Sequence, residues 1–242
     1  MSCGPAGAAW AGRLPGSLPA GWADGGAQAG GVYQVHTPCL SAAHLPALVR
    51  AHAARRGVVL PPPVGAAHGS PQALLALLAE LARRDGPDAA FVLGQQWLPG
   101  HDGALSHAIL QAEHAGQALA LLVEGQARLT PLLSPRLVLG PRQAVLYWTD
   151  ACGAPAQRNF LVDLHMAAVV SLCQWLGGGP QPWTFCFNRP APREAALHEV
   201  HLGPSLRWGC QLDAMLIDRA ALARPWPRGG GPAAAAARAA WR

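Results

Sequence analysis

The chain has 242 residues, of which 51% are hydrophobic and only 13% charged, so it is long enough for one sizeable domain. All eighteen basic residues are arginines, scattered without a basic run, so the net charge of +5 does not indicate a dedicated nucleic-acid surface. Six cysteines without a C-x-x-C pair, in a chain of this length, exclude a disulfide-stapled miniprotein.

The sequence predicts neither a secretory signal nor a membrane span. Its beginning lacks a charged region followed by an apolar stretch. No segment approaches about eighteen apolar residues without a polar interruption. We therefore expect a cytoplasmic protein with reduced thiols.

Composition divides the chain into three parts. Residues 1–35 are rich in Gly, Ala and Pro without a sustained period, which is typical of a disordered or irregular arm. Residues 36–227 carry the periodic apolar pattern of a folded domain. Residues 228–242 form a Gly/Ala/Arg tail, in which the alanines are compatible with a helix but have little to bury.

The first half of the predicted domain is helical. Apolar residues at spacings of three and four indicate a helix from about 44 to 56, with Pro46 in its first turn. Ser70-Pro71 provides an N-cap and a first-turn proline for a leucine-rich helix that ends near Gly86. Three further helices are expected, at 88–97, 104–112 and 117–129.

The second half mixes strands with helices. Short β-like runs at 137–139 and 144–149 are separated by Gly140-Pro141 and predict a hairpin. An apolar helix over 159–176 follows and ends at three glycines. A strand at 183–187, a helix at 193–201 and strands at 206–208 and 215–217 complete the pattern. The expected fold class is α+β: N-terminal helices, then a small, mostly antiparallel sheet packed by helices.

Several blocks within residues 36–227 occur in a familiar order. Each block is weak alone, but their order and spacing make the set more specific. The blocks are Leu93-Gly94, Leu98-Pro99-Gly100, Gly103-Ala104-Leu105, Gln117-Ala118-Leu119, the helix 159–176, Asn188-Arg189-Pro190-Ala191-Pro192, His201–Trp208 and Leu216–Pro227. In this order the chain resembles the N-terminal effector-binding, arabinose-binding-like domain of AraC-type transcriptional regulators.

The resemblance implies a ligand-sensing and dimerisation domain, not an enzyme, without a cofactor. Its expected partners are a small-molecule effector, apolar or amphipathic, and either a second copy or a full-length relative. Full-length members continue into a DNA-binding half with two helix-turn-helix units. This sequence stops fifteen residues after Pro227. We therefore expect no direct sequence-specific DNA binding by this chain, and truncation, a frameshift and a free-standing sensor all stay open.

Residues of the long apolar helix are the candidate ligand contacts. His165 and Cys173 fall on its apolar side, and Trp175 lies near its end. A pocket between this helix and the sheet would be lined by such residues, although packing in the core is the competing interpretation for each. Asp163 is expected to be exposed, because it points to a different side from His165.

Two alternatives to a sensor remain at this point. Glu194, His198 and His201 fall on one helix face, so a small metal-dependent enzyme is one alternative. A solvated helix face gives the same spacing, and the H-E-x-x-H order is absent. A protein-interaction module without a ligand is the other alternative.

Overall fold

The computed structural model describes residues 36, 40, 44–60, 69–98, 103–125, 132–150, 154–227, 229–230 and 232–241 of the chain. All of them belong to one compact unit, Tyr33–Arg242. The predicted arm, residues 1–35, lies outside the described residues.

Among the described residues, the first half of the domain holds five helices, as predicted. They are α1 (Ala47–Arg55), α2 (Pro71–Asp85), α3 (Ala89–Gln95), α4 (Ala104–Leu110) and α5 (Ala115–Glu124). The predicted N-cap is confirmed, since the Ser70 hydroxyl accepts a hydrogen bond from the Ala73 amide at 3.3 Å. Helix α5 is shorter than predicted, and residues 126–131 lie outside the described part.

One five-stranded sheet forms the second half. Its strands are β1 (Leu133–Leu139), β2 (Gln143–Asp150), β3 (Thr184–Cys186), β4 (Leu206–Arg207) and β5 (Ala214–Asp218). Their order is β1-β2-β5-β3-β4, and only the β3–β4 pair is parallel. Along β2, Leu146 and Trp148 are buried while Val145 and Tyr147 are half-buried, so one sheet face belongs to the core. The α+β prediction is confirmed.

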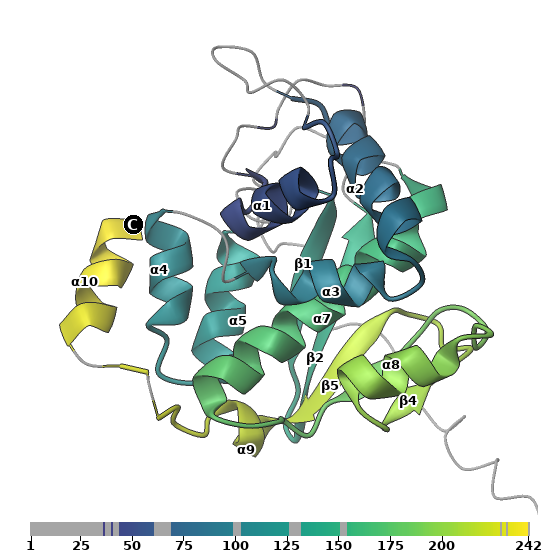
Figure 1. Ribbon diagram of the computed structural model, residues 1–242. Coiled ribbons are helices and arrows are strands. Elements are labelled where there is room, and N and C mark those ends of the chain that lie inside the picture. Colours follow the sequence, from purple (N-terminus) through teal and green to yellow (C-terminus); the bar gives the residue numbers. More distant parts are fainter. Residues whose placement is uncertain are drawn as a thin grey trace, which may run out of the picture. The chain divides into compact units, whose positions relative to one another are not determined.

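Helix α7 (Arg158–Gly177) runs through the centre of the domain and crosses the sheet (Figure 1). Its run from Leu161 to Val169 is buried without a break, so no side of this stretch faces water. The helix ends at Gly178, whose φ of 73° is the left-handed conformation that suits glycine at a C-cap.

By length and composition, the stretch Pro155–Gly177 would suffice to cross a membrane, with a mean hydropathy of 1.5. However, 67% of that window is buried inside the domain. Asp163 and His165 also lie within it and are themselves buried. These features are those of the core helix of the domain, which its own chain covers over most of its length.

The contact between α3 and α7 depends on Gly94. A Cβ atom added at Gly94 would lie 2.3 Å from the carbonyl oxygen of Leu164 and 2.8 Å from Cβ of Ala167. Only the absence of a side chain therefore allows the two helices to approach this closely. This close approach is the physical reason for glycine in the Leu93-Gly94 block.

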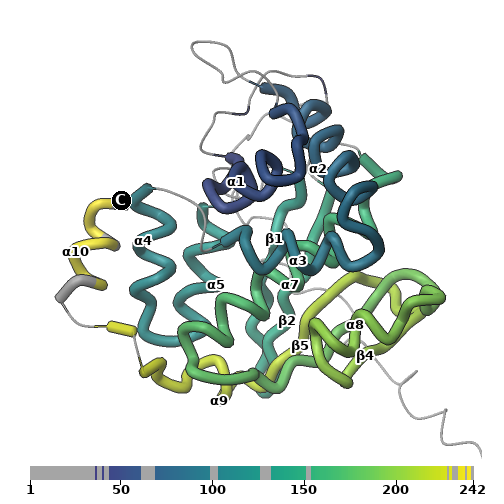
Figure 2. Tube along the Cα trace, viewed as in Figure 1, coloured from purple at the N-terminus to yellow at the C-terminus, as the bar shows by residue number. Residues whose placement is uncertain are grey.

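The C-terminal segment returns to the first half of the domain. The amides of Trp226 and Gly230 donate hydrogen bonds to the carbonyls of Glu113 and Gln111, at 2.8 and 3.2 Å. Helix α10 (Pro232–Trp241) then packs against α4 (Figure 2). Its Ala234 is only 2% exposed, so the alanine run does bury surface, contrary to the expectation from its composition.

Candidate functional site

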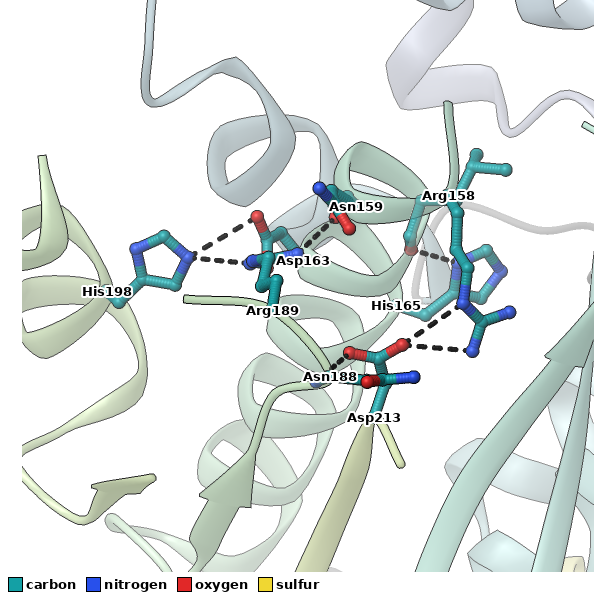
Figure 3. Close-up of polar contacts among 9 residues, drawn as sticks. Arg158, Asn159, Asp163, His165, Asn188, Arg189, His198 and Asp213 are labelled. Carbon is teal, nitrogen blue, oxygen red and sulfur yellow. Dashed lines mark hydrogen bonds and ion pairs between the residues drawn. The ribbon is translucent and has the colours of Figure 1, made fainter. Parts of the chain in front are cut away.

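A buried ion-pair cluster lies where α7 meets the turn after β3 and helix α8 (Ala195–Leu202) (Figure 3). Arg189 of the Arg-Pro-Ala-Pro turn forms an ion pair with Asp163 of α7. It also donates to Nε2 of His198 at 3.0 Å and to the carbonyl of Asn159 at 3.2 Å. One guanidinium group therefore joins three elements of the fold.

Aromatic rings surround this cluster. The Arg189 guanidinium lies 4.8 Å from the ring centroid of Phe187 and 5.8 Å from that of Trp208. Phe187 and Trp208 stack on each other with centroids 4.3 Å apart, and both meet His198 edge-on. The rings keep water away from the charges, which strengthens the attraction but requires every charge to be paired.

The prediction that Asp163 is exposed is wrong. Asp163 is 9% exposed, because every residue from Leu161 to Val169 is buried, including the position opposite the apolar face. A carboxylate in such surroundings needs a counter-charge, which Arg189 supplies from 26 residues further along the chain.

A second buried carboxylate fixes the start of α7 to the sheet. Asp213 is 2% exposed and accepts from Arg158 Nε at 3.1 Å and Nη2 at 2.9 Å. The amide of Asn188 donates to its other oxygen at 2.8 Å. Arg158 also donates to the carbonyl of Trp148 at 3.1 Å. The Arg158–Asp213 pair thus links β2, α7 and the turn that carries Arg189.

His165 is buried in the core and has one unpaired nitrogen. Its Nδ1 donates to the Leu161 carbonyl at 2.6 Å, because a carbonyl only accepts. Its Nε2 is therefore the acceptor, and no described residue donates to it. The Trp97 and Trp148 rings flank the imidazole, with centroids 6.3 and 6.5 Å away.

Burial controls the protonation of His165. Desolvation lowers its pKa to about 4, and the hydrogen bond to Leu161 opposes this only in part. The side chain is therefore neutral at physiological pH. A neutral imidazole with a bare acceptor nitrogen, between two tryptophans, can accept one hydrogen bond from a hydroxyl or amide donor.

The structure does not bring the other two predicted ligand contacts to His165. Cys173 follows it by eight residues on α7, about 12 Å along the helix axis, and is 1% exposed in the core. Burial raises the pKa of its thiol to about 12, so it is an inert packing group at neutral pH. Trp175 is 49% exposed and lies outside the core.

The three residues of the predicted metal face are also separated. Glu194 is exposed before α8. His198 faces the Arg189 cluster, while the ring of His201 stacks on Phe91 with centroids 4.7 Å apart. Within the described residues, no three His, Cys, Asp or Glu side chains are grouped to hold a metal ion.

One hollow in the described surface lies away from His165 and His198. It has a volume of about 470 Å³ and is formed by the end of α1 and one face of α2. Its lining is mostly apolar: Gly57, Val58, Val59, Ala73, Ala76, Leu77, Glu80 and Arg84. It shares no residue with the Arg189 cluster or with the surroundings of His165.

Sequence reasoning missed Arg158, Arg189 and Asp213. One signal for a buried pair was present, since Asp163 stands among nine consecutive residues that are otherwise apolar or histidine. A helix that is apolar on all sides is a buried helix, and a buried carboxylate needs a cation. Which arginine supplies that charge depends on the packing of the turn, which the sequence pattern does not encode.

A solved structure of a transcriptional regulator is similar in fold to this chain. The chain is similar to the transcriptional regulator CdpR from Pseudomonas aeruginosa in its crystal structure, with a TM-score of 0.56 and 13% identity. The match covers 78% of this chain and 59% of CdpR, so this chain spans about three fifths of that regulator. At this identity the likeness shows a shared fold. No curated protein sequence matches the chain.

A family match covers most of the domain. The family described as the N-terminal arabinose-binding domain of AraC transcription regulators matches residues 48–226. This range runs from α1 to the end of the sheet half and includes α7, the Arg189 cluster and His165. The chain belongs to the family of N-terminal arabinose-binding domains of AraC transcription regulators.

Proposed function

We propose that this chain is the effector-sensing and dimerisation domain of an AraC-type transcriptional regulator. The observation that carries the proposal is the family match over residues 48–226, which spans most of the folded unit. We further propose that the domain is cytoplasmic, catalyses no reaction and needs no cofactor. Sequence-specific DNA binding would belong to a separate half of the regulator and not to this domain.

The proposed effector is a small apolar or amphipathic molecule with one hydrogen-bond donor. His165 supports this choice, because its Nε2 is a buried acceptor without a described donor. An unpaired buried polar atom costs free energy that a donor from a ligand would recover. Trp97 and Trp148 offer aromatic surface on either side of the imidazole.

Sensing requires that the effector bind one arrangement of the domain more tightly than another. Helix α7 carries both His165 and Asp163, and Asp163 is tied through Arg189 to the turn before α8. A ligand at His165 would therefore act on the helix that holds the two halves of the fold together. A dimer, or an attached DNA-binding half, would respond to that change.

A thermal-shift screen of fatty acids, amino acids and small phenolics tests the sensor proposal with the purified chain. A ligand that prefers the folded state raises the unfolding midpoint. The shift is expected to shrink in His165→Met, which fills a similar volume but removes the imidazole acceptor. Cys173→Ala and Trp175→Ala test the other two predicted contacts on the same helix.

The outcomes separate the site from the function. Equal shifts in wild type and His165→Met would move the effector site away from His165 and leave the sensor proposal standing. No shift with any compound class would favour the interaction module without a ligand. Sedimentation equilibrium with and without a stabilising ligand tests dimerisation, and a monomer under both conditions would contradict that part of the proposal.

A further inference from the structure

Two cysteines, Cys186 and Cys210, lie close together near the edge of the sheet. Cys186 ends β3 and pairs with Arg207 in the parallel register of β3 and β4. The chain then turns at Gly209, whose φ is 67°, and the amide of Cys210 donates to the carbonyl of Phe187 at 2.9 Å. The backbone therefore holds Cys210 next to the residue that follows Cys186.

Hydrogen bonds place the Cys210 side chain beside the end of β3. The Cys210 thiol donates to the Arg207 carbonyl at 3.6 Å. The same carbonyl accepts from the amide of Phe187, the residue after Cys186, at 2.9 Å. Both thiols are free and half-buried, which leaves them open to small reagents. Cys173, by contrast, is free but enclosed in the core.

We propose that Cys186 and Cys210 form a reversible disulfide when the protein meets a peroxide. In the first step the Cys210 sulfur takes one oxygen from hydrogen peroxide, giving a sulfenic acid and one water. In the second step the Cys186 sulfur attacks the sulfenic sulfur, and its proton leaves with the hydroxyl as a second water. Two thiols and one peroxide thus give one disulfide and two waters, and a dithiol reductant reverses the reaction.

The surroundings of Cys186 indicate which of the two sulfurs reacts first with the peroxide. Burial, and next the Cys210 sulfur, raise the pKa of Cys186 to about 11, while Arg207 acts in the opposite direction. Cys186 is therefore a protonated thiol at neutral pH and is the second sulfur to react. Raising the pH is expected to speed disulfide formation, because more of the Cys186 thiol then ionises.

The disulfide would close residues 186–210 into a loop. That loop contains α8, Arg189 and Trp208, which contribute to the cluster around Asp163. Closing a loop removes conformations from the unfolded chain, so the oxidised form is expected to be more stable. This inference is independent of the proposed effector site and stands or falls by thiol chemistry.

The test uses the full chain, reduced and then treated with hydrogen peroxide. Free thiols are alkylated in denaturant and counted by intact mass spectrometry. The oxidised wild type is expected to carry two fewer alkyl groups than the reduced protein and to melt several degrees higher, with both changes reversed by dithiothreitol.

Single variants identify the pair, because Cys3, Cys39 and Cys152 lie outside the described residues. After peroxide treatment, Cys186→Ser and Cys210→Ser are each expected to keep all their remaining thiols free for alkylation. Cys173→Ala is expected to lose two alkylatable thiols, as the wild type does. An oxidised wild type that keeps all its thiols, or gains only oxygen, overturns the proposal. So does a pair that still forms in either serine variant. If a serine variant fails to fold, non-reducing peptide mapping of the oxidised wild type identifies the linked cysteines, and a linkage other than Cys186–Cys210 overturns the proposal.

Discussion

At the scale of single residues, one buried ion pair links α7 to the turn after β3. Asp163 and Arg189 have side chains that are only 12% and 10% exposed. Removing one partner of such a pair leaves the other charge buried and unpaired. The Arg189 side chain also contacts two aromatic rings, so its loss affects packing as well as charge.

Arg189→Met is therefore expected to lower the free energy of unfolding by about 3 kcal/mol. The change removes the counter-charge of Asp163 while keeping a long, flexible side chain. Urea unfolding followed by circular dichroism measures it. The matched control is Arg83→Met, since Arg83 also pairs with a carboxylate, Glu80, but is 69% exposed. The control should change stability little, and equal losses in both variants would contradict the assigned role of the Arg189 pair.

His165 predicts a pH dependence whose sign follows from its lowered pKa. The folded pKa is about 4, below the unfolded value near 6.5, so the unfolded state binds the proton more readily. The stabilisation is complete above about pH 6.5 and is lost as the pH falls towards 4. At pH 5 the expected loss relative to pH 7 is about 2 kcal/mol.

Denaturant unfolding at pH 7 and pH 5 checks this prediction. His165→Met should show a smaller loss of stability between the two values, because methionine does not titrate. The same substitution at His107, which is exposed, should leave the pH dependence in place. An unchanged pH dependence in His165→Met would falsify the assignment to His165.

At the scale of elements, the position of α7 depends on how closely its neighbours approach. Helix α3 reaches α7 only because Gly94 has no side chain. Helix propensity and packing therefore act in opposite directions at this position. Alanine would favour the helical conformation of α3 by about 1 kcal/mol, but its Cβ would overlap the α7 backbone.

Gly94→Ala is expected to lower the free energy of unfolding by about 1–3 kcal/mol, because overpacking outweighs the gain in helix propensity. Thermal or urea unfolding measures the change. Gly179→Ala is the control, since a Cβ at Gly179 would have no atom within 4 Å and its φ is not positive. A Gly94→Ala protein as stable as wild type would mean that α3 and α7 separate without cost.

At the scale of the whole molecule, the C-terminal segment belongs to the same folded unit as the first helices. The backbone bonds from Trp226 and Gly230 fix it to residues 111–113, and α10 covers α4. The alanine run therefore gains its stability from tertiary contact, because a helix of ten residues is marginal alone.

Ala234→Glu tests this attachment, since Ala234 is buried in the contact of α10. The buried charge should release α10 and increase amide hydrogen exchange in both α10 and α4. Ala236→Glu lies on the exposed side of the same helix and is the matched control. Similar exchange in both variants would show that α10 is not held through Ala234.

The sequence by itself determined the kinds of elements and their order. Ser70, the glycines at the end of α7 and the alternation along β2 act through local backbone geometry, so their pattern is visible in the chain. The same local blocks carried the family resemblance, which the match over residues 48–226 confirms. The effector contacts remain predictions.

Only the tertiary structure decided which residues face each other. The prediction for Asp163 failed because helical spacing separates two faces of a helix, whereas α7 is enclosed on both faces from Leu161 to Val169. The partners Arg189 and Asp213 come from turns distant in sequence, and the proximity of Cys186 to Cys210 depends on the β3–β4 register. Such pairs arise from packing between elements, whose energies depend on distances that a one-dimensional pattern does not contain.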